Sequence, residues 1–111
     1  MTPMANWTPL GPANDFPEGC QIAAHAGDTP VCVFRVEGKL IAIENTCPHA
    51  GLPLDQGERN GLVLTCPYHA YTFNLRNGAN IDDPNDDPVR LLQVRDNKGV
   101  IEVNPDPSNQ D

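Results

Sequence analysis

The chain has 111 residues, a formal net charge of −8, nine glycines and twelve prolines. This length fits one domain, and the many turn-forming residues disfavour long helices and favour a small all-β fold. The acidic balance argues against binding nucleic acid or an anionic membrane, because both need a basic surface. No apolar run is long enough for a transmembrane helix, and the first residues lack the pattern of a signal peptide. We therefore expect a cytoplasmic protein whose four cysteines are metal ligands or thiols rather than disulfide partners.

The predicted elements are short strands joined by tight turns. Three hairpins are expected where segments of alternating or β-branched residues flank Glu37-Gly38, Asn77-Gly78 and Asn97-Lys98-Gly99. In chain order, the paired segments are 31–36 with 39–44, 72–75 with 79–81, and 89–94 with 100–103. A separate strand is expected at 61–65, and Leu91-Leu92 interrupts the alternation in a way that favours a bulge. No window has a helical period, so the sequence predicts an antiparallel domain of about eight to ten short strands.

Two turn-rich segments, 45–60 and 66–71, do not fit this series of strands. Each begins with or contains a Cys-Pro pair followed by a histidine: Cys47-Pro48-His49 and, after 16 residues, Cys66-Pro67-Tyr68-His69. Thiolate and imidazole are the side chains that bind borderline and soft metals, and two such pairs supply four ligands.

Three interpretations of this pattern follow from the residues. The first is a structural Cys2His2 zinc site, although Cys-x-His is shorter than the spacing usual in zinc knuckles. The second is a [2Fe–2S] cluster with two cysteines on one iron and two histidines on the other, since each short loop then spans two irons. The third is a chance placement of buried cysteines and surface histidines, which the matched loops disfavour.

The segments 47–54 and 66–73 resemble the two cluster-binding boxes of Rieske iron–sulfur proteins. The resemblance extends through Asn77-Gly78 and the proline-containing loop to the last hairpin, and so covers about residues 7–104. It implies a Rieske-like antiparallel β-sandwich base with a small inserted cluster-binding subdomain at about 45–75, within a single domain spanning 1–111. It also implies that Cys47 and Cys66 ligate the inner iron of one [2Fe–2S] cluster.

The same resemblance assigns His49 and His69 to the outer, more exposed iron. Residues expected around the cluster are Pro48, Gly51, Leu52, Tyr68, Ala70, Tyr71, Phe73 and Pro84. Two positions depart from the family pattern, because Ala70 stands where glycine is usual and Asn74 where aspartate is frequent. Neither change removes a ligand.

The resemblance also distinguishes between kinds of Rieske protein. Respiratory and photosynthetic members have a further cysteine in each box, and these form a disulfide; Leu52 and Tyr68 occupy those positions here. Those members also have Ser and Tyr hydroxyl groups that donate to the sulfurs, at the positions of Tyr71 and Phe73. Phe73 has no hydroxyl, and the Tyr71 ring is too long to place its hydroxyl where a serine hydroxyl lies. Loss of such donors lowers the potential, so we expect a midpoint at the low end of the Rieske range, about −150 mV.

The resemblance therefore implies a soluble, monomeric ferredoxin that transfers one electron from a flavin-dependent reductase to a ring-hydroxylating oxygenase and catalyses no reaction alone. The acidic loop, defined as residues 82–87, is expected either to be a solvated surface or to dock a basic partner. Two rivals are a small permanent subunit of a reductase, such as a nitrite reductase, and a zinc-stabilised interaction module. An apolar patch on the base would favour the subunit.

The remaining cysteines and the third histidine have no partner motif. Cys32 is expected to be a small buried residue, Cys20 a bystander and His25 a surface residue, and a Cys20–Cys32 disulfide is disfavoured in the cytosol. Leu52, together with Pro53 and Leu54, is expected to pack over the site and exclude water.

Overall fold

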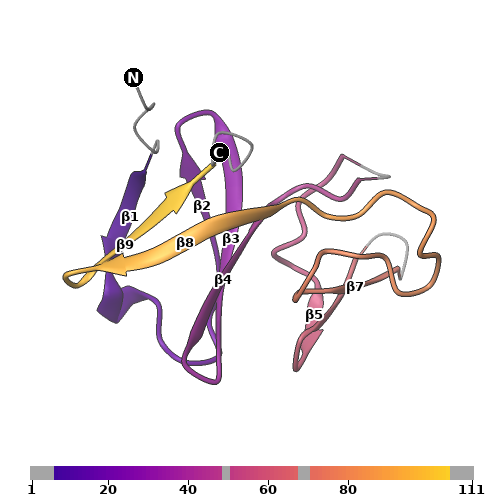
Figure 1. Cartoon of the computed structure of the whole chain (residues 1–111), viewed down its shortest axis with the longest axis horizontal. Helices are drawn as coiled ribbons and strands as arrows, with labels where there is room; N and C mark the ends of the chain where they lie inside the picture. The colour runs from indigo at the N-terminus through magenta and orange to yellow at the C-terminus, as the bar shows by residue number, and fades with distance from the viewer. Residues whose placement is uncertain (1–6, 49–50, 68–70, 106–111) are drawn as a thin grey trace.

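The computed structural model describes residues 7–48, 51–67 and 71–105. These residues form nine strands and one three-residue 3₁₀ helix, arranged as a larger base and a smaller sheet beside it (Figure 1). The elements are β1 (Thr8–Pro12), η1 (Ala13–Asp15), β2 (Gln21–Ala26), β3 (Thr29–Val36), β4 (Lys39–Glu44), β5 (Glu58–Asn60), β6 (Val63–Thr65), β7 (Thr72–Asn74), β8 (Leu91–Asn97) and β9 (Val100–Asn104). Within the described ranges, no helix is long and apolar enough to cross a membrane.

The base is a six-stranded antiparallel sheet with the order β1-β9-β8-β4-β3-β2. Strand β8 changes partner along its length: Leu91 and Leu92 pair with β4, whereas 93–97 pair with β9. No bulge is recorded at Leu91-Leu92, so the interrupted alternation there marks this change of partner. The predicted antiparallel β class is confirmed, because all pairings of the described strands are antiparallel.

Two of the predicted hairpins form with two-residue turns. Val36 pairs with Lys39 across Glu37 and Gly38, whose φ angles are 51° and 78°. The last hairpin has the same form, because Asn97 pairs with Val100 and therefore belongs to β8 rather than to the turn. Positive φ at both turn positions matches the right-handed twist of the strands, which is why glycine occupies the second position in both turns.

The smaller sheet has the order β5-β6-β7 and lies wholly within residues 58–74. The predicted strand at 61–65 is shorter than expected, since Gly61 and Leu62 form the turn between β5 and β6. The hairpin expected around Asn77-Gly78 is also only partly formed. It retains one bridge, Phe73 to Asn80, flanked by bonds from the N–H of Asn74 to the carbonyl of Ala79 and from the N–H of Ile81 to that of Thr72. The carbonyl of Gly78 accepts from the N–H of Val89 at 2.9 Å.

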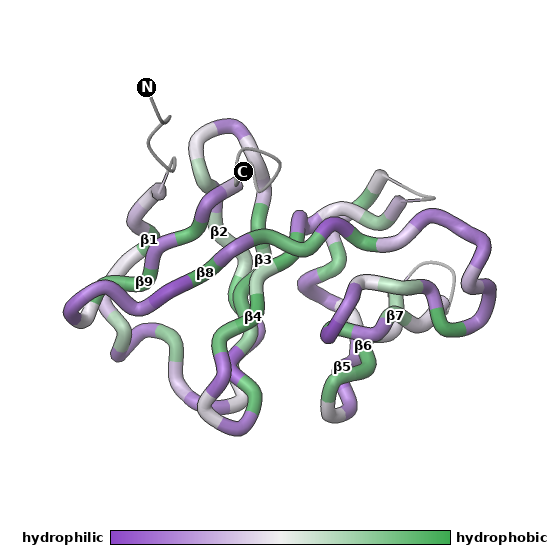
Figure 2. The backbone as a smooth tube through the Cα atoms, in the orientation of Figure 1, coloured by the Kyte–Doolittle hydropathy of each residue, from purple (hydrophilic) through white to green (hydrophobic). Residues whose placement is uncertain are grey.

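The buried apolar side chains form two cores. One lies within the base and contains Phe16, Val31, Val33, Ile101 and Val103. The other joins the inner strands of the base to the small sheet. Figure 2 shows that the hydrophobic stretches concentrate in β3 and β4, the strands that contribute to both cores. Cys47 and Cys66 belong to the second core, so the fold places them between the two sheets.

Candidate metal centre

Cys47 and Cys66 come together although 18 residues separate them. Cys47 follows the end of β4 and Cys66 follows the end of β6, so each sheet supplies one thiol. Their Sγ atoms lie 3.3 Å apart, and the two residues are 0% and 1% exposed. The structure thus brings the two predicted cysteine ligands into one buried site.

The two loops that begin at these cysteines close in the same way. The backbone N–H of Cys47 donates to the carbonyl of Leu52 at 2.8 Å, and that of Cys66 donates to the carbonyl of Tyr71 at 2.7 Å. Each bond links a cysteine to the residue five positions later. In the first loop, Gly51 also donates to the carbonyl of Cys47 at 2.8 Å with a φ of +67°, a conformation that suits glycine. We call 47–52 and 66–71 the first and second Cys-Pro loops.

Buried polar contacts attach the first Cys-Pro loop to the base. Asn45 is 7% exposed, and its side-chain carbonyl accepts from the N–H of Leu54 at 2.7 Å. Its amide donates to the Asp55 carboxylate at 3.0 Å, and this bond is the main reason that the pKa of Asp55 lies below its ordinary value. Gln21 of β2 donates to the backbone carbonyls of Asp55 and Gly57, both at 2.7 Å. The segment that follows the loop is therefore held by a residue of β2 and by the residue that follows β4.

The second Cys-Pro loop is attached to the acidic loop. Asp82 accepts from the N–H and the hydroxyl of Thr72, at 2.7 and 2.9 Å. Asn80, which is 1% exposed, accepts through its side-chain carbonyl from the N–H groups of Asp82 and Asp83 at 2.9 and 3.0 Å. These bonds fix the start of the acidic loop beside the residue that follows Tyr71.

Apolar side chains surround the cysteine pair. Phe73, Leu54 and Leu64 are fully buried in the same core, and Tyr71 packs partly buried against it. Phe73 supplies bulk at this position and has no hydroxyl to donate. A low-dielectric, water-excluding setting of this kind favours a site of low total charge.

The sulfur geometry fits two thiolates on one metal ion. The 3.3 Å separation is far beyond a disulfide bond of about 2.05 Å. It lies within half an ångström of the ~3.8 Å expected for two sulfurs bound to one tetrahedral ion by bonds of about 2.3 Å. No disulfide involves any of the four cysteines, all of which lie in the described ranges. The donor set and spacing therefore suit a metal bound between the loops.

Several predicted site residues fall elsewhere or outside the description. His49, Tyr68, His69 and Ala70 lie outside the described residues. Pro48 is half-buried, whereas Gly51 and Pro84 are exposed. Leu52 is 44% exposed, and it is Leu54 that packs beside the cysteines.

The other cysteines and the third histidine are separate from the centre. Cys32 is fully buried, and burial raises the pKa of its thiol to about 12, so it is not a reactive thiolate. Cys20 is buried too, and its thiol donates to the carbonyl of Val33 at 3.7 Å. His25 is exposed on β2, as expected.

Sequence reasoning missed the polar residues that hold the loops. Asn45 and Asp82 are each one of many asparagines and aspartates in the chain, and no motif distinguishes them. Asn45 has one weak signal, its position at the end of a predicted strand just before the first Cys-Pro pair. Asp82 has none, because its contact with Thr72 depends on how the intervening residues fold back.

Comparison with known proteins gives consistent matches over nearly the whole chain. The family model of the Rieske [2Fe-2S] domain matches residues 6–95. The anthranilate 1,2-dioxygenase ferredoxin subunit of Burkholderia cepacia is 35% identical over 101 residues, which cover 91% of this chain and 94% of that protein. Ferredoxin CarAc of Metapseudomonas resinovorans is 30% identical, with 87% and 92% covered.

Solved structures agree with these matches. The ferredoxin of carbazole 1,9a-dioxygenase from Nocardioides aromaticivorans IC177 superposes with a TM-score of 0.78 at 31% identity, covering 88% of this chain and 98% of that one. A chain from a complex of reduced oxygenase and oxidized ferredoxin in carbazole 1,9a-dioxygenase gives a TM-score of 0.80 at 28% identity, with 92% and 95% covered.

Proposed function

Because this chain belongs to the Rieske [2Fe-2S] domain family, we propose that it is a one-electron carrier, a ferredoxin that passes electrons from a flavin-dependent reductase to a ring-hydroxylating oxygenase. The observation that carries the proposal is the buried Cys47–Cys66 pair with its sulfurs 3.3 Å apart. The Burkholderia relative is a dioxygenase ferredoxin subunit and the Metapseudomonas relative is a ferredoxin, and the chain covers almost the full length of both. In this role the chain alone catalyses no reaction.

The proposed ligands of the cluster are Cys47 and Cys66 on one iron and His49 and His69 on the other. A bound [2Fe–2S] cluster supplies a one-electron couple whose potential depends on hydrogen bonds to sulfur and on burial. The loop geometry supports this assignment for the cysteines, since the two Cys-Pro loops close in the same way: the backbone N–H of each cysteine donates to a carbonyl of its own loop. The proposal treats 1–111 as one domain with a cluster-binding subdomain at about 45–75.

The surrounding residues favour a low potential. Phe73 fills a buried position without a donor, and the N–H of Cys47 is used by Leu52 rather than directed at a sulfur. Fewer donors to sulfur stabilise the reduced, more negative state less. We therefore propose a midpoint near the lower limit of the Rieske range, about −150 mV.

Charge supports recognition of basic partners. The acidic loop contains four aspartates and no basic residue, and three of them are exposed. Asp82 is committed to Thr72, which leaves the later part of the loop as the proposed docking element. The four cysteines, all in the described ranges, form no disulfide, and this also suits the proposed cytoplasmic location.

A transfer assay tests the carrier role. The holo-chain is reduced anaerobically, freed from excess reductant and mixed with the oxygenase component of a ring-hydroxylating system, and its reoxidation is followed by visible absorbance. A carrier is reoxidised at a rate that rises with oxygenase concentration. A holo-chain that accepts electrons from the reductase but transfers none to any oxygenase would count against the proposal.

The rival of a permanent reductase subunit predicts a broad apolar patch on the base. Among the described residues, the exposed large apolar side chains are Leu52, Ile81 and Val100, and only Val100 belongs to the base. A single exposed valine does not form such a patch. The carrier role is therefore preferred.

A further inference from the structure

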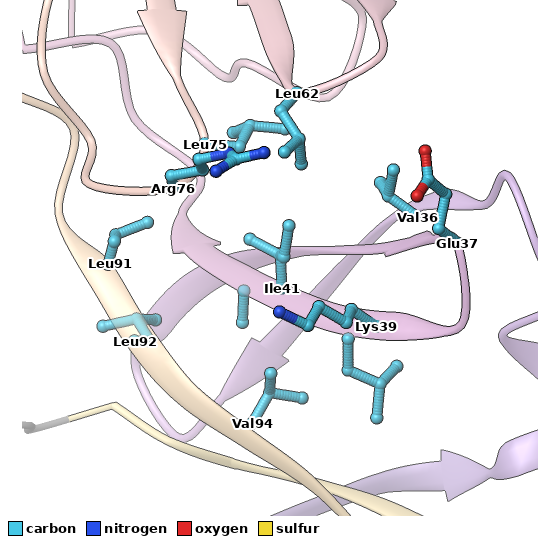
Figure 3. A pocket seen from close by; sticks show the side chains of 12 residues that line it. Val36, Glu37, Lys39, Ile41, Leu62, Leu75, Arg76, Leu91, Leu92 and Val94 are labelled. Carbon is cyan, nitrogen blue, oxygen red and sulfur yellow. The ribbon is translucent and has the colours of Figure 1, made fainter.

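A groove separates the base from the small sheet on the side of the β3–β4 turn. Its walls come from β4 and β8 on the base and, on the other side, from Leu62 in the β5–β6 turn and from Leu75 and Arg76, which follow β7 (Figure 3). Its volume is about 730 Å³, and none of the described residues of the two Cys-Pro loops lines it. The groove is thus distinct from the candidate metal centre.

The walls combine apolar side chains from both sides of the groove with charged ones. Ile41, Leu62 and Leu91 are partly buried side chains that line the groove and also pack against the core that contains the two cysteines. Clefts of roughly 300–1,000 Å³ between lobes, lined by apolar side chains with a few polar groups, are typical of small-molecule sites. The groove matches this description in size and position, and its lining has a larger polar share.

Two unpaired cations enter the groove. Of the seven basic residues, Arg35, Arg59, Arg90 and Arg95 donate hydrogen bonds from their side chains. Lys39, Arg76 and Lys98 have no side-chain hydrogen bond or ion pair with any other described residue. Two of these three lie in the groove, where Figure 3 shows the Lys39 amine and the Arg76 guanidinium extending between the walls. Among the described residues of the lining, Glu37 is the one acidic side chain, at the end near Val36.

This arrangement is unusual for a chain with a net charge of −8. Cations beside an apolar surface, without acidic partners, favour an anion that carries an apolar group. We propose that the groove binds a small amphipathic carboxylate. Its apolar body lies against Ile41, Leu62 and Leu91, and its carboxylate is held by Lys39 and Arg76.

A small molecule fits better than a protein partner. A stable protein interface buries about 800 Å² on each side. The exposed large apolar residues among those described are Leu52, Ile81 and Val100, and none of them lines the groove, so they do not extend its lining into a wider apolar face. Both walls belong to one chain, which allows a ligand to be contacted from two sides at once.

A ligand bound in the groove is expected to stabilise the packing of the small sheet against the base. Leu75 lines the groove and belongs to the core around Cys47 and Cys66. A ligand that binds only the folded state raises the melting temperature by mass action. The same contact is expected to slow loss of iron on dilution into a chelator.

The test titrates the iron-loaded full chain with octanoate and, separately, 2-naphthoate, followed by calorimetry and by the thermal melt. Octylammonium serves as the probe of opposite charge. The variants are Lys39→Gln with Arg76→Gln, and Leu62→Ser. The matched control is Lys98→Gln, which removes the third unpaired cation, on the β8–β9 turn away from the groove. Circular dichroism and the visible spectrum show that each variant is folded and loaded.

We expect one saturable site for at least one of the two carboxylates, a raised melting temperature, and binding weakened about tenfold or more in the double variant. Leu62→Ser weakens binding as well, and Lys98→Gln leaves it within about twofold. Preference for octanoate or naphthoate distinguishes an aliphatic from an aromatic body.

Three results would overturn the proposal. One is the absence of saturable binding by both carboxylates, and another is equal binding by the double variant or by octylammonium. The third is a concentration-dependent dimer that the double variant abolishes, since the groove would then be covered by a second copy of the chain.

Discussion

The carboxylate of Asp82 holds Thr72 through two hydrogen bonds, one from the backbone N–H at 2.7 Å and one from the hydroxyl at 2.9 Å. Thr72 follows Tyr71, whose carbonyl closes the second Cys-Pro loop. One of the four aspartates expected to dock a partner therefore has a structural task. It connects the acidic loop to the loop that contains Cys66.

Replacement of Asp82 by alanine is expected to destabilise the fold and the iron site. Loss of Oδ2, the single carboxylate oxygen that accepts both bonds, leaves two Thr72 donors to solvent, at a cost of about 1 kcal/mol for an exposed pair. We expect a lower denaturation midpoint and faster iron loss to a chelator, measured by visible absorbance. Asp87→Ala is the matched control, because the Asp87 carboxylate accepts no hydrogen bond from a described residue. Equal behaviour of the two variants would contradict the role of Asp82.

Neutralising the end of the acidic loop tests docking. We expect Asp86→Asn with Asp87→Asn to weaken the salt dependence of electron transfer to the oxygenase and to slow transfer at low salt, because steering by opposite charge is lost. Stopped-flow reoxidation across a salt series measures both effects. Asp15→Asn with Asp28→Asn removes the same charge from the base, and it is expected to leave the slope nearly unchanged. If both pairs change the slope equally, the acidic loop has no special part in docking.

The cysteines of the two Cys-Pro loops are expected to differ sharply from the others. Cys47→Ser and Cys66→Ser each remove a proposed ligand from the 3.3 Å sulfur pair, so most of the iron should be lost. Cys20→Ser is the control, since a hydroxyl can still donate to the carbonyl of Val33 as the thiol does. Iron per chain and visible absorbance give the result. Full iron content in either loop variant would refute the ligand assignment.

Glu18 makes part of the stability depend on pH. Its carboxylate accepts from the N–H groups of Gly38 and Glu37 in the β3–β4 turn, at 2.8 and 2.6 Å, and these bonds lower its pKa from the ordinary 4.5. A lowered folded-state pKa means that the stabilisation is fully present above the unfolded-state pKa and is lost as pH falls through the folded-state value.

We therefore expect wild type to exceed Glu18→Gln in urea midpoint at neutral pH, by a margin that shrinks as the pH falls below 4.5. Glu58→Gln removes a carboxylate that accepts no hydrogen bond from a described residue, and it is not expected to follow this profile. A margin between wild type and Glu18→Gln that stays constant through the acidic range would contradict the role of the turn bonds.

Local patterns in the sequence predicted much of the fold. The β3–β4 and β8–β9 hairpins were predictable because Gly38 and Gly99 sit in turns that need positive φ. Strands β1, β2 and β5 were not predicted, and β5 lies at the end of the segment 45–60, which was expected to be turn-rich. Pro9, Gly11 and Pro12 weaken the strand pattern of β1, which forms at the edge of the sheet where proline is tolerated. Strand β2 is the other edge and depends on pairing with β3.

The candidate site was predictable only where its residues form a motif. The spacing of Cys47 and Cys66 identified them, and the structure brings their sulfurs together. The contacts of Asn45 and Asp82 arise from the tertiary fold, because ordinary polar residues become clamps only when a loop folds back onto them. The groove between Ile41 and Leu62 is of the same kind, since each sheet supplies one wall.

A redox titration of the purified chain, followed by EPR of the reduced state, tests the central claim most directly. The account predicts a reversible one-electron couple with a midpoint near the low end of the Rieske range, about −150 mV, and the rhombic signal of a histidine-ligated [2Fe–2S] centre. A midpoint several hundred millivolts higher would contradict the argument from Phe73 and the N–H of Cys47. A colourless, EPR-silent protein with one bound zinc, after loss of a cluster during purification has been excluded, would contradict the electron-transfer function itself.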